Sequence, residues 1–360
     1  MELGIFSLMP QRDISKPVAE IYQETTDLIG LAEDIGFDTA WLTEHHFGNY
    51  CMCPSPLLLA GHLAAKTTRI KMGLAVLVLP LYNPLRMLEE IGMVDQLSGG
   101  RLVIGFGSGY QAFEFDRFEV DLADNWSITN EVMDIVEMGM AEGRVEYQGK
   151  HFTIPETPIG TPVLQQPRPE VFVAGAQPDY LTRAAKAGYV PFVTVGGGDT
   201  NALLGVRSHI EKHYREAGHT GTLPFAINRS IYVTDNMDDA RDAAERVLYT
   251  ARLVMAFRGK YEHFNGIEVV PQPYEDEPSI ETILENLPFG DPESCAEKMV
   301  RDIKATGARH YSMFCQFGGL DHKRARRSLE RIGAEVLSLV DKELGGLKEF
   351  GTNAQPVAAE

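Results

Sequence analysis

The sequence predicts an α/β protein with the (β/α)8 architecture, a TIM barrel with insertions in its βα loops. Three observations lead to this prediction: strand and helix signals alternate nearly one for one, about eight such units fit in the 360 residues, and most strand segments are continuous apolar runs. Such runs are typical of a parallel sheet covered on both faces, and eight units are the number that closes a barrel. A doubly wound sheet is the alternative. We expect one domain at residues 1–344 and a flexible tail at 345–360.

The individual elements follow from periodicity and from start and stop signals. Apolar runs predict strands at residues 3–9, 37–42, 70–79, 102–106, 171–173, 189–195, 225–233 and 310–314. In the helix that follows Pro17, the residues Val18, Ile21 and Leu28 share one face, and Gly36 stands where a helix ends. The same reasoning predicts helices at residues 17–35, 54–67, 84–98, 125–140, 178–187, 201–217, 237–257, 291–306 and 322–344.

Two segments are too long to be simple connections. Residues 141–170 contain a predicted hairpin at 145–154, and residues 259–286 are acidic and rich in proline. Such insertions form lids or partner surfaces, although a solvated decoration is an equal alternative for the second.

Charge and composition exclude several classes of function. Lys and Arg total 33 and Asp and Glu total 51, so the net charge is −18. That charge repels nucleic acids and anionic membrane surfaces. No apolar run approaches the ~20 residues of a membrane span, and no signal peptide is recognisable. We therefore expect a cytoplasmic protein whose four cysteines are buried or incidental thiols.

In such a barrel the chemistry is expected at the carboxyl ends of the strands. The second strand is followed by Thr43, Glu44, His45 and His46. Adjacent residues of an extended segment point to opposite faces, so one histidine faces the site and the other packs behind it. An imidazole can donate, accept or shuttle a proton near neutral pH. A metal site is not expected, because consecutive ligands converge poorly on one ion; a structural histidine remains the alternative.

Two glycine-containing segments also follow predicted strands. Gly105-Phe-Gly107-Ser-Gly109-Tyr110 lacks the third glycine of a dinucleotide fingerprint, and no clear helix follows at once. Its glycines instead suit the close approach of a flat ligand. Gly175-Ala176-Gln177 precedes a proline-initiated helix, and such a helix start can bind phosphate through free amide N–H groups.

The second strand and the residues after it resemble a signature of the bacterial luciferase-like, flavin-dependent monooxygenases, here Gly-Phe-Asp-Thr-Ala-Trp-Leu-Thr-Glu-His-His-Phe at 36–47. Further matching segments lie at residues 73–80, 83–86, 95–101, 105–107, 290–295 and 318–320. The resemblance covers about residues 1–339 and is strongest before residue 120. Its motifs are specific for the superfamily and poorly specific for the substrate.

The resemblance implies a monooxygenase that binds reduced FMN (FMNH2), usually delivered by a separate flavin reductase. O2 then adds to the flavin C4a carbon, and the resulting hydroperoxide oxygenates a small organic substrate. It also implies a homodimer, because luciferase-like barrels pair.

Residue by residue, the resemblance suggests these roles. His45 matches the family's catalytic histidine, and Glu114 falls near an acidic position of the catalytic chain. Ala75 and Val76 match a pair under the isoalloxazine, where the family has a non-prolyl cis peptide. The loop with Gly107, Ser108 and Tyr110 corresponds to the flavin-contacting loop, and Gly175, Ala176 and Gln177 match the phosphate-binding turn.

The sequence also departs from the family pattern. Gly107 and Ser108 replace the Cys-Arg pair of luciferase, and Trp126-Ser127 stands where an arginine is common. The phosphate is therefore expected to depend on backbone amides or on unassigned arginines. A deazaflavin-dependent hydride transferase, a non-catalytic flavin-binding subunit and a metal-dependent hydrolase remain alternatives on the same fold.

Overall fold

Eight parallel strands form a closed barrel in the computed structural model, which describes residues 1–258 and 264–350. The strands are β1 (Glu2–Ser7), β2 (Thr39–Leu42), β3 (Lys71–Leu74), β5 (Leu102–Gly107), β8 (Glu170–Ala174), β9 (Val190–Thr194), β10 (Ala226–Ser230) and β15 (His310–Phe314). The ring closes because β1 pairs with both β2 and β15, while β3 pairs with β5. This closure confirms the predicted (β/α)8 barrel and overturns the doubly wound alternative.

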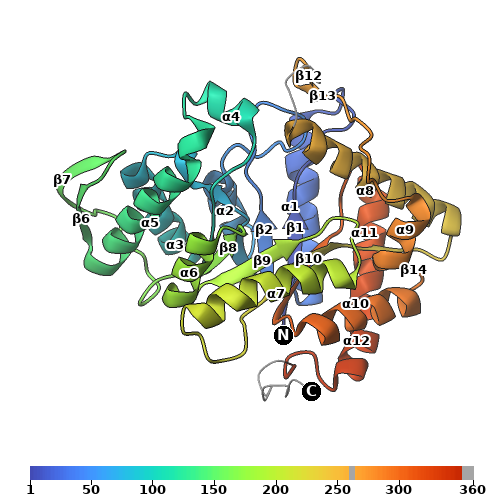
Figure 1. Ribbon diagram of the computed structural model, residues 1–360. Coiled ribbons are helices and arrows are strands. Elements are labelled where there is room, and N and C mark those ends of the chain that lie inside the picture. The colour runs from blue at the N-terminus through green and yellow to red at the C-terminus, as the bar shows by residue number, and fades with distance from the viewer. Residues whose placement is uncertain (259–263, 351–360) are drawn as a thin grey trace.

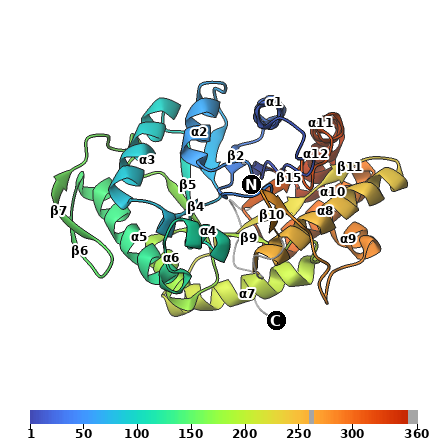
Figure 2. The same cartoon turned by 90° about the horizontal axis from the view of Figure 1, so that it is seen from above.

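Helices surround the strands, as the view from above shows (Figure 2). They are α1 (Val18–Ile35), α2 (Pro56–Ala64), α3 (Pro84–Ser98), α5 (Asn125–Glu142), α6 (Pro178–Ala187), α7 (Thr200–Glu216), α8 (Met237–Arg258), α10 (Pro292–Thr306), α11 (His322–Arg331) and α12 (Leu337–Leu344). Their ends follow the signals in the sequence. Gly36 closes α1 in the left-handed conformation, and the Asn83 side chain caps α3 through the Arg86 N–H.

Three predicted elements are divided in the structure. The run at 70–79 consists of β3 and the short β4 (Leu77–Val78), with a cis peptide bond at Ala75–Val76 between them. The run at 225–233 ends as β11 (Tyr232–Val233), which leaves the barrel to pair with β14 (Phe289–Gly290). The helix predicted at 322–344 contains a π-helical segment, η4 (Ile332–Val336), between α11 and α12.

Both long insertions lie outside the regular barrel (Figure 1). The first contains the predicted hairpin, as β6 (Arg144–Gln148) and β7 (Thr153–Pro158). The second contains β12 (Phe264–Asn265), β13 (Glu268–Val269) and α9 (Ile280–Asn286), while residues 259–263 lie outside the described residues. The sequence also did not predict α4 (Ala112–Arg117), nor the single turns η1 (Leu79–Leu81) and η2 (Leu122–Asp124). In Figure 1, α4 lies at the end of the barrel opposite the N-terminus.

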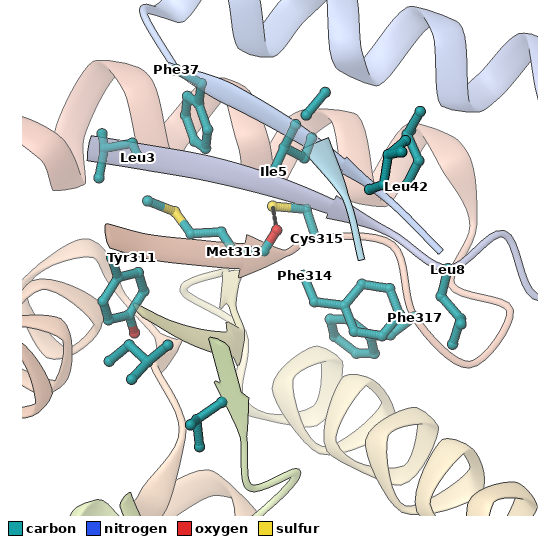
Figure 3. Close-up of a cluster of buried hydrophobic side chains, with 14 of the residues drawn as sticks. Leu3, Ile5, Leu8, Phe37, Leu42, Tyr311, Met313, Phe314, Cys315 and Phe317 are labelled. Atoms are coloured by element: carbon teal, nitrogen blue, oxygen red, sulfur yellow. Dashed lines mark hydrogen bonds between the residues drawn. The ribbon is translucent and has the colours of Figure 1, made fainter. Parts of the chain in front are cut away.

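Strand alternation divides the core into an outer and an inner layer. On β1, Leu3 and Ile5 belong to the outer layer between strands and helices, where Tyr311 and Met313 of β15 join them (Figure 3). The inner layer fills the barrel with Trp41, Val103, Phe172, Val190 and Ala226, together with the partly buried Phe6, Ala75 and Phe192.

Trp41 is the centre of the inner layer, which we call the barrel floor. Its indole ring lies 4.7 Å from the rings of both Phe172 and Phe192, and its Nε1–H donates to Nε2 of His310 at 2.7 Å. Gly4 and Gly73 make room for it, because a Cβ atom at either position would lie within 2.8 Å of the indole. The floor therefore fills the interior of the barrel with packed aromatic rings.

The two ends of the described chain lie close together (Figure 1). The ammonium group of Met1 donates to the carbonyl oxygens of Leu347, Lys348 and Phe350. Residues 351–360 of the expected tail lie outside the described residues. No helix in residues 1–258 or 264–350 has both the length and the apolar character needed to cross a membrane.

Candidate active site

The carboxyl ends of three neighbouring strands place small residues side by side. In the strand register Gly107 lies opposite both Val78 and Ala174. Gly107 cannot be larger, because a Cβ atom there would lie 2.4 Å from Cγ2 of Val76. Ala75 and Val76 precede β4, and Ser108 follows β5, so the predicted flavin-ring residues occupy adjacent strand ends.

His45 pairs with Glu114 at the same end of the barrel. The segment after β2 carries His45, and α4 carries Glu114, whose carboxyl group is almost fully buried. Nδ1 of His45 lies 3.1 Å from Oε1 of Glu114, and the same oxygen accepts the backbone N–H of His46 at 2.6 Å. The His45 side chain is 16% exposed, and no described residue is hydrogen-bonded to its Nε2. One ring nitrogen is thus fixed by a carboxylate while the other remains open.

Glu44 and His46 form a second carboxylate–imidazole pair beside the first. His46 Nε2 lies 3.0 Å from Oε1 of Glu44. The other oxygen of Glu44 accepts the backbone N–H of Val78 at 3.1 Å and the hydroxyl of Tyr82 at 2.8 Å. Glu44 therefore joins the end of β2 to β4 and to the turn after it. The alternation at residues 44–46 places His45 on the opposite side, as predicted.

Aromatic rings surround the His45 imidazole. The ring of Tyr50 lies 4.9 Å from it and that of Tyr110 lies 6.0 Å from it, both edge to face. Burial raises the pKa of Tyr50 well above its ordinary value, so this phenol stays neutral. Arg258 of α8 lies 5.5 Å from the Tyr110 ring centroid. Two aromatic rings thus flank the His45 imidazole, beside its polar contact with Glu114.

Two buried thiols lie next to the segment that carries His45. Cys51 Sγ is 3.2 Å from the Thr43 hydroxyl, and the carbonyl of Cys53 accepts the backbone N–H of His45. Burial raises the pKa of Cys51 to about 12 and raises the pKa of Cys53 as well. Both therefore remain protonated and poorly nucleophilic at neutral pH.

The turn of residues 175–177 lies at the start of α6, directly after β8. Gly175, Ala176 and Gln177 are all exposed. Trp126 packs against this turn, because a Cβ atom on Gly175 would lie 3.1 Å from its indole, and the Trp126 ring contacts Tyr180. His209 Nε2 lies 3.0 Å from the carbonyl oxygen of Ala176. Trp126 therefore takes the position beside the turn where an arginine was expected.

The structure brings the predicted residues together in two groups. His45, Glu114 and Tyr110 form one cluster, and the register of β4, β5 and β8 aligns the remaining candidates. Sequence reasoning did not assign site roles to Glu44, Gln111, Tyr50 or Tyr82. Only Glu44 had a usable signal, its two-residue spacing from His46.

The arrangement leaves Nε2 of His45 free to exchange a proton, while Glu114 holds the ring through Nδ1. In the part of the chain that the structure describes, no group of three or more His, Cys, Asp or Glu side chains is arranged to hold a metal ion.

Comparison with known proteins gives relatives that match nearly the whole chain. A sequence profile described as luciferase-like monooxygenase matches residues 1–310. The uncharacterized protein y4vJ of Sinorhizobium fredii is 33% identical, with 96% of this chain and 99% of that protein covered. The oxygenase component of the flavin-dependent trigonelline monooxygenase of Acinetobacter baylyi is 26% identical, with 94% and 95% covered.

Solved structures share the fold. Monooxygenase RslO1 of Streptomyces bottropensis superposes with a TM-score of 0.80 at 21% identity, with 94% of this chain and 99% of that chain covered. The oxygenating constituent of 3,6-diketocamphane monooxygenase from Pseudomonas putida, in complex with FMN, gives 0.75 at 21% identity, with 93% and 97% covered. The coenzyme F420-dependent tetrahydromethanopterin reductase of Methanopyrus kandleri gives 0.70 at 21% identity, with 94% and 98% covered.

Proposed function

The chain belongs to the luciferase-like monooxygenase family, and from this premise we propose that it is a flavin-dependent monooxygenase. It uses reduced FMN and O2 to oxygenate a small organic substrate, and a separate flavin reductase supplies the FMNH2. The observation that carries the proposal is the His45–Glu114 pair after β2, which fixes Nδ1 of His45 and leaves its Nε2 without a hydrogen-bond partner among the described residues.

In this proposal His45 is the residue that transfers the proton. Reduced flavin supplies the electrons that activate dioxygen when it is bound. Nε2 of His45 then accepts or returns a proton, and Glu114 keeps the ring oriented and stabilises its charged form. The rings of Tyr50 and Tyr110 cover part of the imidazole, and we expect them to reduce the amount of water around it.

The residues at the strand ends fit a flat ring system. Gly107 and Ala174 carry minimal side chains, and the space at Gly107 is already limited by Val76. We assign Ala75, Val76, Gly107, Ser108 and Tyr110 to contacts with the isoalloxazine. Because the lack of a Cβ at Gly107 makes room for Val76, we assign the ring contact at this strand end to the Val76 side chain and to the Gly107 backbone.

The phosphate group is assigned to the exposed turn of Gly175, Ala176 and Gln177. This turn precedes the ten-residue helix α6, whose free amide N–H groups after Pro178 and whose dipole favour an anion, while Asp179 in the first turn opposes one. Trp126 beside the turn carries no charge that would attract the phosphate, so we expect modest affinity for FMN. Modest affinity suits a protein that receives its flavin from another enzyme.

The partners belong to the same proposal. The name of the Acinetobacter relative, an oxygenase component, supports a separate reductase. A homodimer and a cytoplasmic location complete the proposal, and light scattering of the purified protein tests the dimer.

Rapid mixing tests the function directly. The protein is loaded anaerobically with FMNH2 and mixed with O2 in a stopped-flow spectrometer, with free FMNH2 as the reference. We expect the return of oxidised-flavin absorbance to be delayed by the protein and to change when a substrate is added. Reoxidation at the rate of free FMNH2, with or without candidate substrates, would contradict the proposal.

The same preparation separates the alternatives. Tight binding of a reduced deazaflavin and hydride transfer without O2 consumption would favour the hydride transferase. FMNH2 binding with oxidation kinetics that are indifferent to His45→Ala would favour a non-catalytic subunit.

A further inference from the structure

The side chain of Gln111 is an unusual neighbour of His45. Gln111 is fully buried, and its Nε2 lies 3.0 Å from Nδ1 of His45. The same Nδ1 is 3.1 Å from Oε1 of Glu114. A ring nitrogen cannot donate to a carboxylate and accept from an amide at the same time, so only one of these contacts is a hydrogen bond as the groups are oriented.

The carboxylate decides which role Nδ1 has. A glutamate oxygen accepts hydrogen bonds, and this one already accepts the N–H of His46 at 2.6 Å. An unprotonated Nδ1 would place two electron-rich atoms 3.1 Å apart in a buried setting, which is costly. Nδ1 therefore carries a proton and donates it to Glu114. The amide N–H of Gln111 then faces another donor.

A second observation on Gln111 leads to the same result. Its oxygen Oε1 is buried, and none of the described residues is hydrogen-bonded to it. Rotating the amide by half a turn exchanges Oε1 and Nε2, the two orientations that hydrogen-bonding networks must distinguish. Oε1 then accepts Nδ1–H of His45 and can also accept the hydroxyl proton of Tyr110, which lies 3.4 Å from that position. Nε2 then takes the former place of Oε1, where no donor among the described residues opposes it.

We infer that Gln111 is a positioning residue for His45: its side-chain carbonyl accepts Nδ1–H together with Glu114, and this leaves Nε2 of His45 without a proton at the open end of the barrel. When the His45 ring is uncharged, its Nε2 is then a proton acceptor and not a donor. The consequence for turnover rests on the proposed function, whereas the position of the proton is a property of the protein alone.

Other groups that face His45 must be considered in any titration. These are Glu114 of α4, Tyr110 of the loop after β5, and Tyr50 and Cys51 of the segment after β2, with Arg258 of α8 over the Tyr110 ring. The adjacent His46, whose N–H shares Glu114 Oε1, and its partner Glu44 belong to the same group. Tyr50 and Cys51 stay neutral below pH 9 because burial raises the pKa of each. A change observed between pH 5 and 8 on altering Gln111 therefore reports on the imidazole and its contacts.

NMR of protein labelled with ¹⁵N-histidine tests the inference without cofactor or substrate. The chain has ten histidines, so the His45 signals are identified by their loss in His45→Asn. We expect the neutral ring to show a protonated Nδ1 and a bare Nε2. A bare Nδ1 with a protonated Nε2 would overturn the inference, and this measurement needs only the native chain.

The variant Gln111→Met distinguishes the two orientations by the sign of its effect. It keeps the length of the side chain and removes both the donor and the acceptor. If Oε1 accepts from Nδ1–H, the charged ring loses a partner, and the midpoint of the His45 titration falls by at least about half a pH unit. If the amide N–H donates instead, the same variant moves the midpoint upward, which would contradict the inference.

Two further variants complete the experiment. Gln111→Glu keeps an acceptor at the same place and should move the midpoint upward. Gln148→Met, on the distant exposed hairpin, is the matched control and should leave it unchanged. Failure of the monooxygenase assay would leave these titrations intact, so the two proposals fail independently.

Discussion

His45 and His310 lie at opposite ends of the same barrel and have similar neighbours. Each imidazole is surrounded by aromatic rings and faces a carboxylate: His45 has Tyr50, Tyr110 and Glu114, and His310 has Trp41, Phe172 and Glu2. The composition of the two surroundings therefore does not separate a reactive histidine from a structural one.

The difference lies in how the ring nitrogens are used. His310 accepts the Trp41 indole N–H at Nε2, and its Nδ1 faces Glu2 Oε2 at 3.5 Å. His45 uses Nδ1 alone for contacts with the described residues and is 16% exposed, whereas His310 is 1% exposed. Nε2 of His310 is thus engaged by the barrel floor, whereas Nε2 of His45 has no hydrogen-bond partner among the described residues and is available for chemistry.

The largest effect is expected from His45→Ala. Removing a proton-transfer group lowers the rate of substrate oxygenation by about 10²–10⁴-fold, while the floor keeps the fold intact. Product formation with FMNH2 and O2 is the measurement, and circular dichroism checks the fold. The exposed His62→Ala is the matched control. Unchanged turnover in His45→Ala would place the chemistry elsewhere.

Trp41→Ala should have the largest effect on stability. Loss of a fully buried indole from the floor is expected to lower the free energy of unfolding by about 3–5 kcal/mol, and it also leaves His310 Nε2 without its donor. Guanidinium denaturation measures this change. Trp126→Ala, at a half-buried position of α5, should cost clearly less. Equal losses for both would contradict the picture of a sealed floor.

Glu44→Gln tests the hydrogen bonds that join the end of β2 to β4 and to the turn after it. Glu44 accepts hydrogen bonds from Val78, Tyr82 and His46, and an amide has only one acceptor oxygen for them. We expect a loss of about 1–3 kcal/mol in the free energy of unfolding. Glu90→Gln, which removes an exposed pair with Arg86, should cost at most about 1 kcal/mol. A Glu44→Gln variant as stable as the control would show that this network is dispensable.

The smallest effect near neutral pH concerns the thiols. Burial raises the pKa of Cys51 and Cys315 to about 12 from an ordinary value of 9.0. The unfolded thiols ionise above pH 9 while the folded ones cannot, so this contribution to stability is intact below pH 9 and declines between pH 9 and 12. Equilibrium unfolding across that range measures the decline.

All four cysteines are buried, so a thiol reagent at pH 8 should label them only after denaturation. Rapid labelling of native Cys51 would show that solvent reaches this end of the barrel far more freely than the 16% exposure of the His45 side chain indicates.

The fold was predictable because its signals are local. Apolar runs and helix ends at residues such as Gly36 and Asn83 are determined by neighbours in the chain, and they located all eight barrel strands. The run at 70–79 was not resolved into two strands, because the break at Ala75–Val76 leaves no mark in the apolar pattern.

The candidate active site was harder to predict from the sequence than the fold. The short helix α4 was missed because Phe113 and Phe115 alternate with polar residues as they would in a loop or strand. Without α4, nothing in the sequence brings Glu114 to His45, 69 positions away. Gln111 was not recognised for the same reason, since its importance depends on two atoms of His45 and Glu114 that meet only after folding.

The position of the two tryptophans has a practical consequence. Trp41 is sealed in the floor, and Trp126 lies against the exposed turn at Gly175. Their emission should therefore report separate events: the first responds when the barrel opens, and the second, under the proposed phosphate assignment, when an anion occupies the turn. Replacing one indole at a time would turn the chain into its own fluorescent sensor for either unfolding or ligand arrival, with no dye attached.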